Sequence, residues 1–273
     1  MLRTLGVIPA RLASTRLPRK LLRIVAGKPL LAWTIEAARA CPQLDRILVA
    51  ADSEEIAALC RTLNVPCELT SPSLPSGTDR IHAIAQLPAW SDAHIYVNLQ
   101  GDEPLLRPSH IAALISPFTN DALDPTAITT LKVHCTPENI ANPNAVKVVT
   151  TSTGRALYFS RATIPYDRNN QDKNCHPDPE RSEGEGPASP SLPSTTYFKH
   201  IGLYAYHRSA LNLFPTLPPS LLEQTERLEQ LRFLENNIPI HVSPTTHDTI
   251  GVDTEADLVQ IEPLLRAQHS TPK

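Results

Sequence analysis

Apolar runs and helically spaced apolar residues alternate along the first hundred residues of the chain. The short apolar runs predict buried strands at Leu5–Ile8, Ile47–Ala51 and His94–Leu99, and we expect a further short strand around Cys67–Leu69. Apolar residues three or four positions apart predict helices between them, at Leu30–Ala40, Glu54–Leu63 and Asp79–Gln86. This alternation predicts an α/β fold with a mainly parallel central sheet and flanking helices.

The second half of the chain is less regular. Its apolar runs predict strands at Ala127–His134, Ala145–Thr150, Ile201–Tyr206 and Ile240–Val242. Leucines interleaved with charged residues predict helices at Leu221–Asn236 and Glu255–Gln268. We expect all of these elements to form a single domain spanning residues 1–273.

A polar segment at residues 167–196 interrupts this pattern. It reads DRNNQDKNCHPDPERSEGEGPASPSLPSTT, which is rich in Pro, Gly and Ser and nearly free of large apolar residues. Such a segment cannot bury enough surface to offset the entropy of ordering it. The sequence therefore predicts a low-complexity, disordered surface insertion within the domain.

Composition narrows the class of protein. Hydrophobic residues make up 41% of the chain and charged residues 19%, so a sizeable core can be buried. The net charge of -3, without a long basic tract, argues against a nucleic-acid partner. The five cysteines lack metal-ligand spacing, and no apolar run has the length of a membrane span. We expect a soluble, cytoplasmic protein with reduced thiols and no membrane partner.

Four cations follow the first predicted strand, in the stretch VIPARLASTRLPRK. They are Arg11, Arg16, Arg19 and Lys20. Ligands of open α/β sheets bind beyond the carboxyl ends of the strands, where this loop lies. Crowded cations repel one another unless an anion is present, and guanidinium and ammonium groups suit phosphate. The loop is neither a GxxxxGK[ST] nor a GxGxxG motif, and a solvated basic loop is the alternative interpretation.

Two acidic motifs are candidates for a metal site. Asp102 and Glu103, in NLQGDEP, follow a predicted strand at the same edge of the sheet, and carboxylates there suit Mg²⁺. An ordinary turn explains that motif equally well. Asp253, in GVDTEADL, is placed to cap the last helix, which is the commoner role for such a residue. It becomes a metal ligand only if it faces Asp102.

Four further motifs are weak when taken singly. SGTDRI, at residues 76–81, is typical of a capping turn. NPNAVKVV, YFSRATIPY and KHIGLYAY place basic residues beside strands, namely Lys147, Arg161, Lys199 and His200. A lone basic residue beside a strand is usually solvated. Together, these residues are candidates for binding a second anionic substrate such as a sugar acid.

Eight motifs occur together in one order: PARLASTRLPRK, SGTDR, NLQGDEP, NPNAVKVV, YFSRATIP, HIGLYAY, LEQLRFLENN and GVDTEADL. In the identity and order of these motifs, the chain resembles the 3-deoxy-manno-octulosonate cytidylyltransferase (CMP-Kdo synthetase) family over nearly its whole length. The resemblance implies a glycosyltransferase-A-like nucleotide-diphospho-sugar transferase fold. It also implies a Mg²⁺-dependent homodimer that converts CTP and Kdo to CMP-Kdo and pyrophosphate for lipopolysaccharide assembly.

The resemblance also assigns roles to residues. It implies that nucleotide is bound by Pro9, Ala10, Arg11, Ser14, Lys20, Arg80 and Gln100. It implies that the sugar is bound by Gln100, Arg161, His200, Tyr204, Glu226 or Glu229, and Gln230. Asp102 and Asp253 would hold Mg²⁺, and Lys20, Arg16 and Asp102 would be catalytic. Catalysis would then consist of positioning and charge stabilisation during in-line attack on the α-phosphorus, without a dedicated general base.

One departure and several alternatives accompany the resemblance. The family has glycine where this chain has Arg19, which removes conformational freedom from the loop and adds a charge. The Pro-Arg-Lys run is similar to that of CMP-sialic acid synthetases, so a cytidylyltransferase for another sugar acid is an alternative. An inactive nucleotide-binding or regulatory module is another alternative, which the intact Lys20, Asp102 and Asp253 disfavour. The missing glycine fingerprint disfavours a dehydrogenase.

Overall fold

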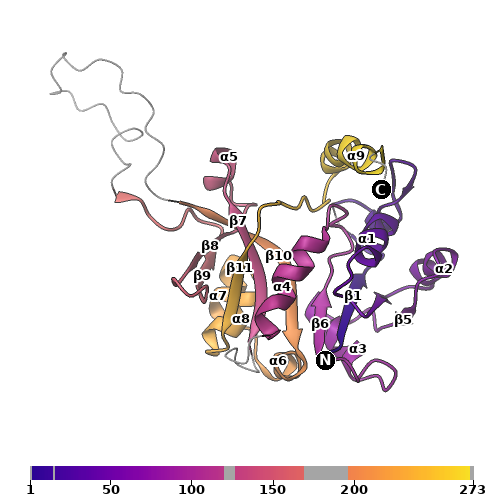
Figure 1. Cartoon of the computed structure of the whole chain (residues 1–273), viewed down its shortest axis with the longest axis horizontal. Coiled ribbons are helices and arrows are strands. Elements are labelled where there is room, and N and C mark those ends of the chain that lie inside the picture. The colour runs from indigo at the N-terminus through magenta and orange to yellow at the C-terminus, as the bar shows by residue number, and fades with distance from the viewer. Residues whose placement is uncertain (1, 15, 120–126, 169–195, 271–273) are drawn as a thin grey trace, which may run out of the picture.

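A mixed sheet forms the centre of the computed structural model, which describes residues 2–14, 16–119, 127–168 and 196–270 (Figure 1). The strand order is β5-β4-β1-β6-β10-β7-β11. These strands span Cys67–Leu69, Arg46–Ala51, Thr4–Ala10, Ile95–Asn98, Phe198–His207, Ile128–His134 and Ile240–Pro244. Neighbouring strands pair in parallel, except that β10 is antiparallel to both β6 and β7. The predicted α/β fold with a mainly parallel sheet is therefore confirmed.

Helices cover both faces of the sheet. One apolar layer joins the sheet to α1, α2, α4 and α9, which span Leu30–Arg39, Glu54–Thr62, Pro108–Ile115 and Glu255–Ser270. The other joins it to α3, α6 and α8, which span Gly77–Ala85, Arg208–Leu213 and Gln230–Glu235. Along β1, Val7 belongs to the second layer and Ile8 to the first. Both faces of β1 are therefore buried, which explains why its sequence is a continuous apolar run.

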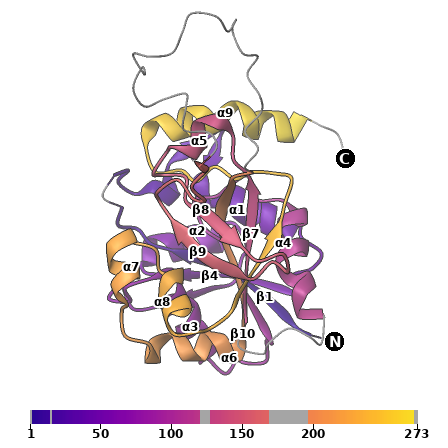
Figure 2. The same ribbon diagram turned by 90° about the vertical axis from the view of Figure 1, so that its left-hand side faces the viewer.

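A hairpin extends one end of the sheet. Its strands β8 (Lys147–Thr150) and β9 (Ala156–Ser160) are antiparallel, and β8 also pairs with β10 at Lys147 and Lys199. The hairpin lies on the same side of the molecule as α8 and α7 (Leu221–Glu226), as Figure 2 shows. A short helix, α5 (Pro137–Ile140), precedes the hairpin.

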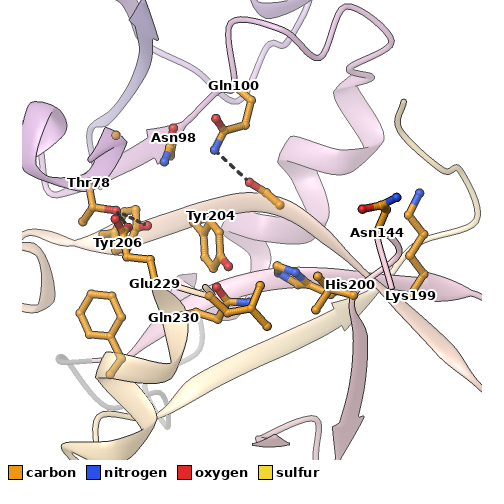
Figure 3. A pocket seen from close by; sticks show the side chains of 15 residues that line it. Thr78, Asn98, Gln100, Asn144, Lys199, His200, Tyr204, Tyr206, Glu229 and Gln230 are labelled. Atoms are coloured by element: carbon orange, nitrogen blue, oxygen red, sulfur yellow. Dashed lines mark hydrogen bonds between the residues drawn. The ribbon is translucent and has the colours of Figure 1, made fainter. Parts of the chain in front are cut away.

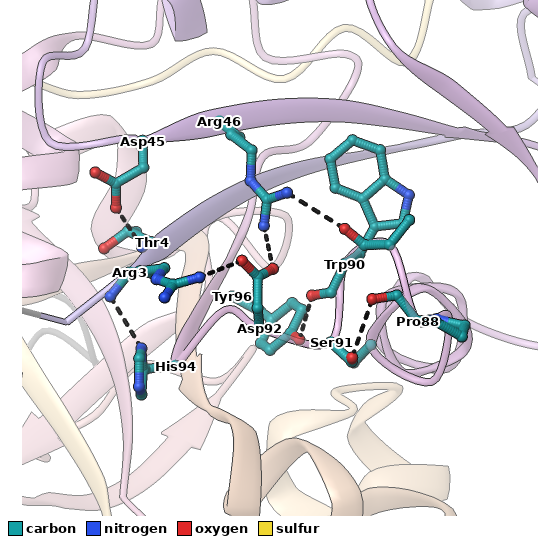
Figure 4. A network of polar contacts seen from close by, with 12 residues as sticks. Arg3, Thr4, Asp45, Arg46, Pro88, Trp90, Ser91, Asp92, His94 and Tyr96 are labelled. Carbon is teal, nitrogen blue, oxygen red and sulfur yellow. Dashed lines mark hydrogen bonds and ion pairs between the residues drawn. The ribbon is translucent and has the colours of Figure 1, made fainter.

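The amino ends of β1, β4 and β6 are joined by a polar network (Figure 4). Asp92 accepts hydrogen bonds from Arg3, at 2.6 Å, and from Arg46. These guanidinium groups, Arg46 first, hold the pKa of Asp92 below its ordinary value. Arg46 also lies over the ring of Trp90, 5.1 Å from the ring centroid. This network links the three strands at the amino edge of the sheet. The candidate site residues lie at the opposite, carboxyl edge.

Residues 221–236 form two helices, where the sequence pattern predicted one. The single helix predicted at Leu221–Asn236 is wrong: α7 ends at Glu226 and α8 begins at Gln230. Arg227 separates them in a left-handed conformation, with φ 53° and ψ 50°, which no helix continues through. The predicted insertion at 167–196 falls almost wholly outside the described residues. Among the described residues, no helix is long and apolar enough to cross a membrane.

Candidate active site

Two adjoining cavities open at the carboxyl edge of the sheet. The first, which we call the loop cavity, has a volume of about 340 Å³ and is lined by Pro9, Arg11, Ala13, Ser14, Arg16, Lys20, Leu21, Gly77, Gln100, Gly101, Asp102 and Asp253. The second, the sheet cavity, has a volume of about 380 Å³. It is lined by Gly77, Thr78, Asn98, Gln100, Asn144, Val146, Lys199, His200, Gly202, Tyr204, Tyr206, Leu228, Glu229, Gln230 and Phe233. Gly77 and Gln100 belong to both linings, so the cavities meet there.

Lys20 joins the two predicted metal ligands in the loop cavity. Its Nζ donates to Asp102 Oδ2 and, at 2.8 Å, to Asp253 Oδ1. Burial lowers the pKa of Lys20, but the two carboxylates raise it above its ordinary value overall, so the ammonium is charged. Arg16 donates to the other oxygen of Asp253 at 2.7 Å. Two carboxylates that converge on one cation, beside further positive charge, suit a divalent metal bound together with phosphate.

Asp253 faces Asp102 and does not cap the last helix. The hydroxyl of Thr254 accepts from the Asp257 backbone N–H at 3.2 Å, and the Asp257 carboxylate accepts from the Thr254 N–H at 2.8 Å. These two reciprocal hydrogen bonds pair backbone N–H groups at the start of α9, so Asp253 is not needed as the cap. The side chain of Asp253 is therefore available to the loop cavity.

A strap of residues 245–253 carries Asp253 across the edge of the sheet. The Thr245 N–H, at the start of the strap, donates to the Lys132 carbonyl at 2.8 Å. His110 Nε2 donates to the His247 carbonyl at 3.0 Å. The Val252 N–H then donates to the Asp102 carbonyl at 3.0 Å. These bonds fix the strap against α4 and the NLQGDEP turn, and thereby bring two distant acids together.

Three of the four loop cations line the loop cavity, and the fourth does not. Arg11 is held by the Leu74 carbonyl, 2.8 Å from its Nη2. Arg19 pairs with Glu55 at the start of α2 and lines a separate surface pocket. Its backbone is left-handed, with φ 55° and ψ 34°, the conformation in which glycine costs least. Arg19 therefore occupies a glycine-like position, and its charge is directed toward α2.

Ala10 and Arg80 lie deeper than the other predicted nucleotide ligands. Both are fully buried, and neither is among the residues that line the two cavities. Arg80 Nη1 donates to the Thr70 hydroxyl, while its Nε and Nη2 find no hydrogen-bond partner among the described residues. Burial lowers the pKa of Arg80, and the nearby Arg11 adds to this effect. A direct nucleotide contact by either residue stays a prediction.

Most of the predicted sugar ligands line the sheet cavity (Figure 3). They are Gln100, His200, Tyr204, Glu229 and Gln230. The left-handed Arg227 ends α7 just before Glu229, so the break between the helices turns Glu229 and Gln230 toward the cavity. Glu229 accepts from the Thr78 hydroxyl, and burial raises the pKa of its carboxyl. The break between α7 and α8, which the sequence pattern did not reveal, thus builds this wall of the sheet cavity.

His200 is neutral in the sheet cavity. The Thr130 hydroxyl donates to the Leu203 carbonyl at 2.8 Å, so it accepts from His200 Nε2, 2.9 Å away. Burial lowers the pKa of His200 to about 3. Its ring therefore offers hydrogen bonds without charge near pH 7.

Arg161 and Glu226 bind each other and do not line either cavity. Glu226 Oε2 accepts from the Arg161 N–H at 3.0 Å, and the Glu226 carbonyl accepts from Arg161 Nε at 2.8 Å. Ser160 donates to the remaining carboxylate oxygen at 2.5 Å. The structure thus favours Glu229 over Glu226 as the cavity's acid, and direct sugar contacts by Arg161 and Glu226 stay predictions.

Lys147, which the sequence offered as a candidate anion ligand, has a structural role: its ammonium binds backbone carbonyls. Its Nζ donates to the carbonyls of Asn142 and Ala145, both at 2.7 Å, and of Arg161 at 2.8 Å. The side chain is fully buried. Every ammonium hydrogen has a carbonyl partner, so Lys147 holds the wall beside Asn144 and has no donor left for a substrate.

Lys199, which the sequence offered as a candidate for binding an anionic substrate, lines the sheet cavity, but four other polar residues of its lining were not identified from the sequence: Thr78, Asn98, Asn144 and Tyr206. One of them carried a detectable signal. Asn98 precedes Gln100 by two positions, and side chains two apart share one face of a strand. The others come from elements whose proximity only the fold determines, as with the Thr78 hydroxyl, 3.3 Å from the Tyr206 hydroxyl.

Comparison with known proteins agrees with this geometry. The family model described as Cytidylyltransferase matches residues 5–240, so the chain belongs to the cytidylyltransferase family. Its relatives include the 3-deoxy-manno-octulosonate cytidylyltransferase of Acidobacterium capsulatum, 52% identical over 97% of each chain. The enzyme of that name from Koribacter versatilis is 47% identical and covers 98% of this chain and 92% of its own.

A solved structure extends the comparison to three dimensions. It is described as CMP:2-keto-3-deoxy-manno-octonic acid synthetase complexed with CTP. It superposes with a TM-score of 0.83 at 33% identity and covers 97% of this chain and 99% of its own. The likeness thus spans nearly the whole length of both chains.

Proposed function

We propose that this chain transfers CMP from CTP to 3-deoxy-D-manno-octulosonate (Kdo), giving CMP-Kdo and pyrophosphate. The observation that carries the proposal is the pair of cavities that meet at Gln100. One is lined by three cations and two carboxylates, the other mainly by amide, hydroxyl and imidazole groups. A triphosphate suits the first and a polyhydroxylated sugar the second. The names of the relatives and the CTP complex of the similar structure support the same pair of substrates.

In this proposal the loop cavity receives the triphosphate. Arg11, Arg16 and Lys20 offer positive charge from one short loop, and small residues such as Ala13 and Ser14 leave room for close approach. The lysine is anchored by its two carboxylates, so its charge is fixed in place before the substrate arrives. Preorganised charge of this kind stabilises the charge that develops during phosphoryl transfer.

We propose Mg²⁺ as the cofactor, with Asp102 and Asp253 as its protein ligands. Their contact with the same ammonium supports this, since both reach one cationic centre. In the described part of the chain, no group of three or more His, Cys, Asp or Glu side chains is placed to hold a metal ion. A pair of carboxylates suits Mg²⁺, which is commonly held by one or two carboxylates together with substrate phosphates. When bound, it supplies positive charge at the reacting phosphate.

The reaction itself is a displacement at phosphorus. The anomeric hydroxyl of Kdo attacks the α-phosphorus and loses its proton to solvent, the bond from the α-phosphorus to the α–β bridging oxygen breaks, and pyrophosphate leaves. Gln100, at the junction of the cavities, is placed to orient the reacting groups. We assign no general base: His200 lines the sheet cavity, but its pKa of about 3 makes it a weak proton acceptor.

Three further properties are proposed from the family resemblance. We propose that the chain forms one domain, works as a homodimer, and acts in the cytoplasm to supply lipopolysaccharide assembly. Light scattering during size-exclusion chromatography tests the oligomeric state. A mass of one chain at micromolar concentration would refute the dimer.

Phosphorus NMR of the reaction mixture tests the proposed bond cleavage. With CTP, Mg²⁺ and Kdo, we expect pyrophosphate and one new phosphodiester resonance from CMP-Kdo. Formation of CDP and a phosphorylated sugar would mean attack at another phosphorus and would contradict the proposal.

A further inference from the structure

The two ends of the sheet cavity differ in charge. Lys199 and Asn144 lie at one end, while Glu229 and Thr78 lie at the other (Figure 3). Among the described residues that line this cavity, Lys199 is the one Lys or Arg side chain and Glu229 the one carboxylate. A substrate that carries a carboxylate and several hydroxyl groups is itself polarised. The cavity therefore favours one orientation of such a substrate.

The other basic residues near the cavity cannot replace Lys199. His200 is buried and neutral, with its Nε2 engaged by Thr130. The ammonium of Lys147 is bound by three backbone carbonyls. Arg161 is held by Glu226 and Pro143 and does not line the cavity. A carboxylate in the sheet cavity thus has one cationic partner among these residues.

Lys199 is paired in this structure with an acid that a substrate can replace. Its Nζ lies 2.9 and 3.0 Å from the two carboxylate oxygens of Asp248, and 3.4 Å from the Thr249 carbonyl. The Lys199 side chain is 21% exposed and that of Asp248 37% exposed. An ion pair that reaches solvent is weak, so exchange of one carboxylate for another costs little.

We propose that Lys199 recognises the carboxylate of the sugar acid, and that Asp248 pairs with the Lys199 ammonium while the cavity is empty. The inference rests on the proposed function and identifies the group by which its second substrate is selected. The proposed orientation places the hydroxylated tail of the substrate toward Glu229 and Thr78. Glu229 there accepts hydrogen bonds from hydroxyl groups and repels a carboxylate.

The position of Lys199 is consistent with the chemistry at phosphorus. Asp248 belongs to the same strap as Asp253, and that strap is bonded to Asp102 through Val252. In a 2-keto sugar acid, the carboxylate is attached to the carbon that carries the attacking hydroxyl. A carboxylate bound beside the strap therefore keeps that hydroxyl on the side of the two metal-binding acids.

The test compares Lys199→Met with Lys132→Met, a matched control. Lys132 lies on the neighbouring strand β7, donates to the Thr150 hydroxyl at 2.7 Å and lines neither cavity. Steady-state pyrophosphate release gives KM for CTP and for Kdo. Loss of one charge-assisted hydrogen bond predicts that Lys199→Met raises KM for Kdo about 10-fold or more, with KM for CTP unchanged. We expect Lys132→Met to leave both values near wild type.

Two further measurements separate recognition from a structural role. The carboxamide of Kdo lacks the negative charge, so the wild-type preference for acid over amide should collapse in Lys199→Met. Asp248→Asn removes the competing carboxylate and should lower KM for Kdo. An undiminished preference for the acid in a folded Lys199→Met variant, or a raised KM in Asp248→Asn, would overturn the proposal. If the wild-type protein releases no pyrophosphate with any sugar acid, the proposed function fails and this inference fails with it.

Discussion

The ammonium of Lys20 lies 2.8 Å from Asp253 Oδ1, although 233 positions separate the two residues in the chain. The same ammonium binds Asp102, so the first loop, the NLQGDEP turn and the strap before α9 meet at one nitrogen. The contact explains why cations and acids coexist at this edge. Each offsets the charge of the other in the free protein, and in the proposed function a nucleotide triphosphate with its metal would replace the internal pairing.

Substituting either acid tests the paired-carboxylate site. We expect Asp102→Asn and Asp253→Asn each to reduce turnover on the order of 100-fold or more, because each removes charge that holds the metal and orients Lys20. Initial rates of pyrophosphate release over a range of Mg²⁺ concentrations measure the effect. The thermal unfolding midpoint of each variant serves as the control for folding. Near-normal Mg²⁺-dependent turnover in Asp253→Asn would reduce Asp253 to a structural partner of Arg16 and Lys20.

Lys147 provides a prediction about stability. Lys147→Met has a similar length but leaves three carbonyls, one buried and two partly buried, without their shared donor. Unsatisfied buried polar groups are costly, so we expect a loss of roughly 3 kcal/mol or more in the free energy of unfolding. Urea denaturation measures this loss, and Lys132→Met, which gives up one side-chain hydrogen bond and a cation–π contact with Phe198, should lose much less. Equal losses in the two variants would contradict the assigned role.

His200 makes stability depend on acidity. Its pKa is about 3 in the folded protein, against an ordinary value of 6.5. Between these values the unfolded chain binds a proton that the folded protein does not, so stability present above pH 6.5 is lost as the pH falls. From pH 7.5 to pH 5, this one residue contributes a loss of about 2 kcal/mol.

Replacing the imidazole isolates that contribution. His200→Gln cannot titrate, so its free energy of unfolding should fall by about 2 kcal/mol less than that of wild type over the same pH range. Urea denaturation at pH 7.5 and pH 5 measures the difference. Parallel pH dependence in the two proteins would show that the ring is protonated in the folded state.

Deleting residues 174–194 tests the prediction that residues 167–196 are a surface insertion with no part in the reaction. The segment is too polar to contribute to a core, and every cavity-lining residue named above lies outside it. We expect a deletion closed by a short linker to retain turnover within about 2-fold of wild type. A folded deletion variant with strongly reduced kcat would assign the segment a role in the reaction.

Local patterns predicted the strands that build the site. The presence of β1, β4 and β6 followed from apolar runs, because parallel strands are buried on both faces. The same patterns placed the first loop and the NLQGDEP turn at one edge. The approach of Asp253 to Asp102 was stated only as a condition, since bonds between the strap, α4 and that turn decide it.

Other features depend on conformations that the sequence pattern does not reveal. The interleaved leucines of residues 221–236 predicted one helix, but a left-handed Arg227 divides it and directs Glu229 to the cavity. Lys147 had the charge of an anion ligand, yet the turn at Asn142 and the end of β9 surround it with carbonyls. Tertiary contacts overrode the local signal in both cases.

Pyrophosphate release with CTP and Mg²⁺ tests the central claim most directly. The assay is run in parallel with Kdo, with N-acetylneuraminic acid and without a sugar. The account predicts release with Kdo alone. Release with N-acetylneuraminic acid instead would keep the nucleotide chemistry and change the sugar. No release in any arm, from folded protein that still binds CTP, would contradict the assignment of a cytidylyltransferase activity.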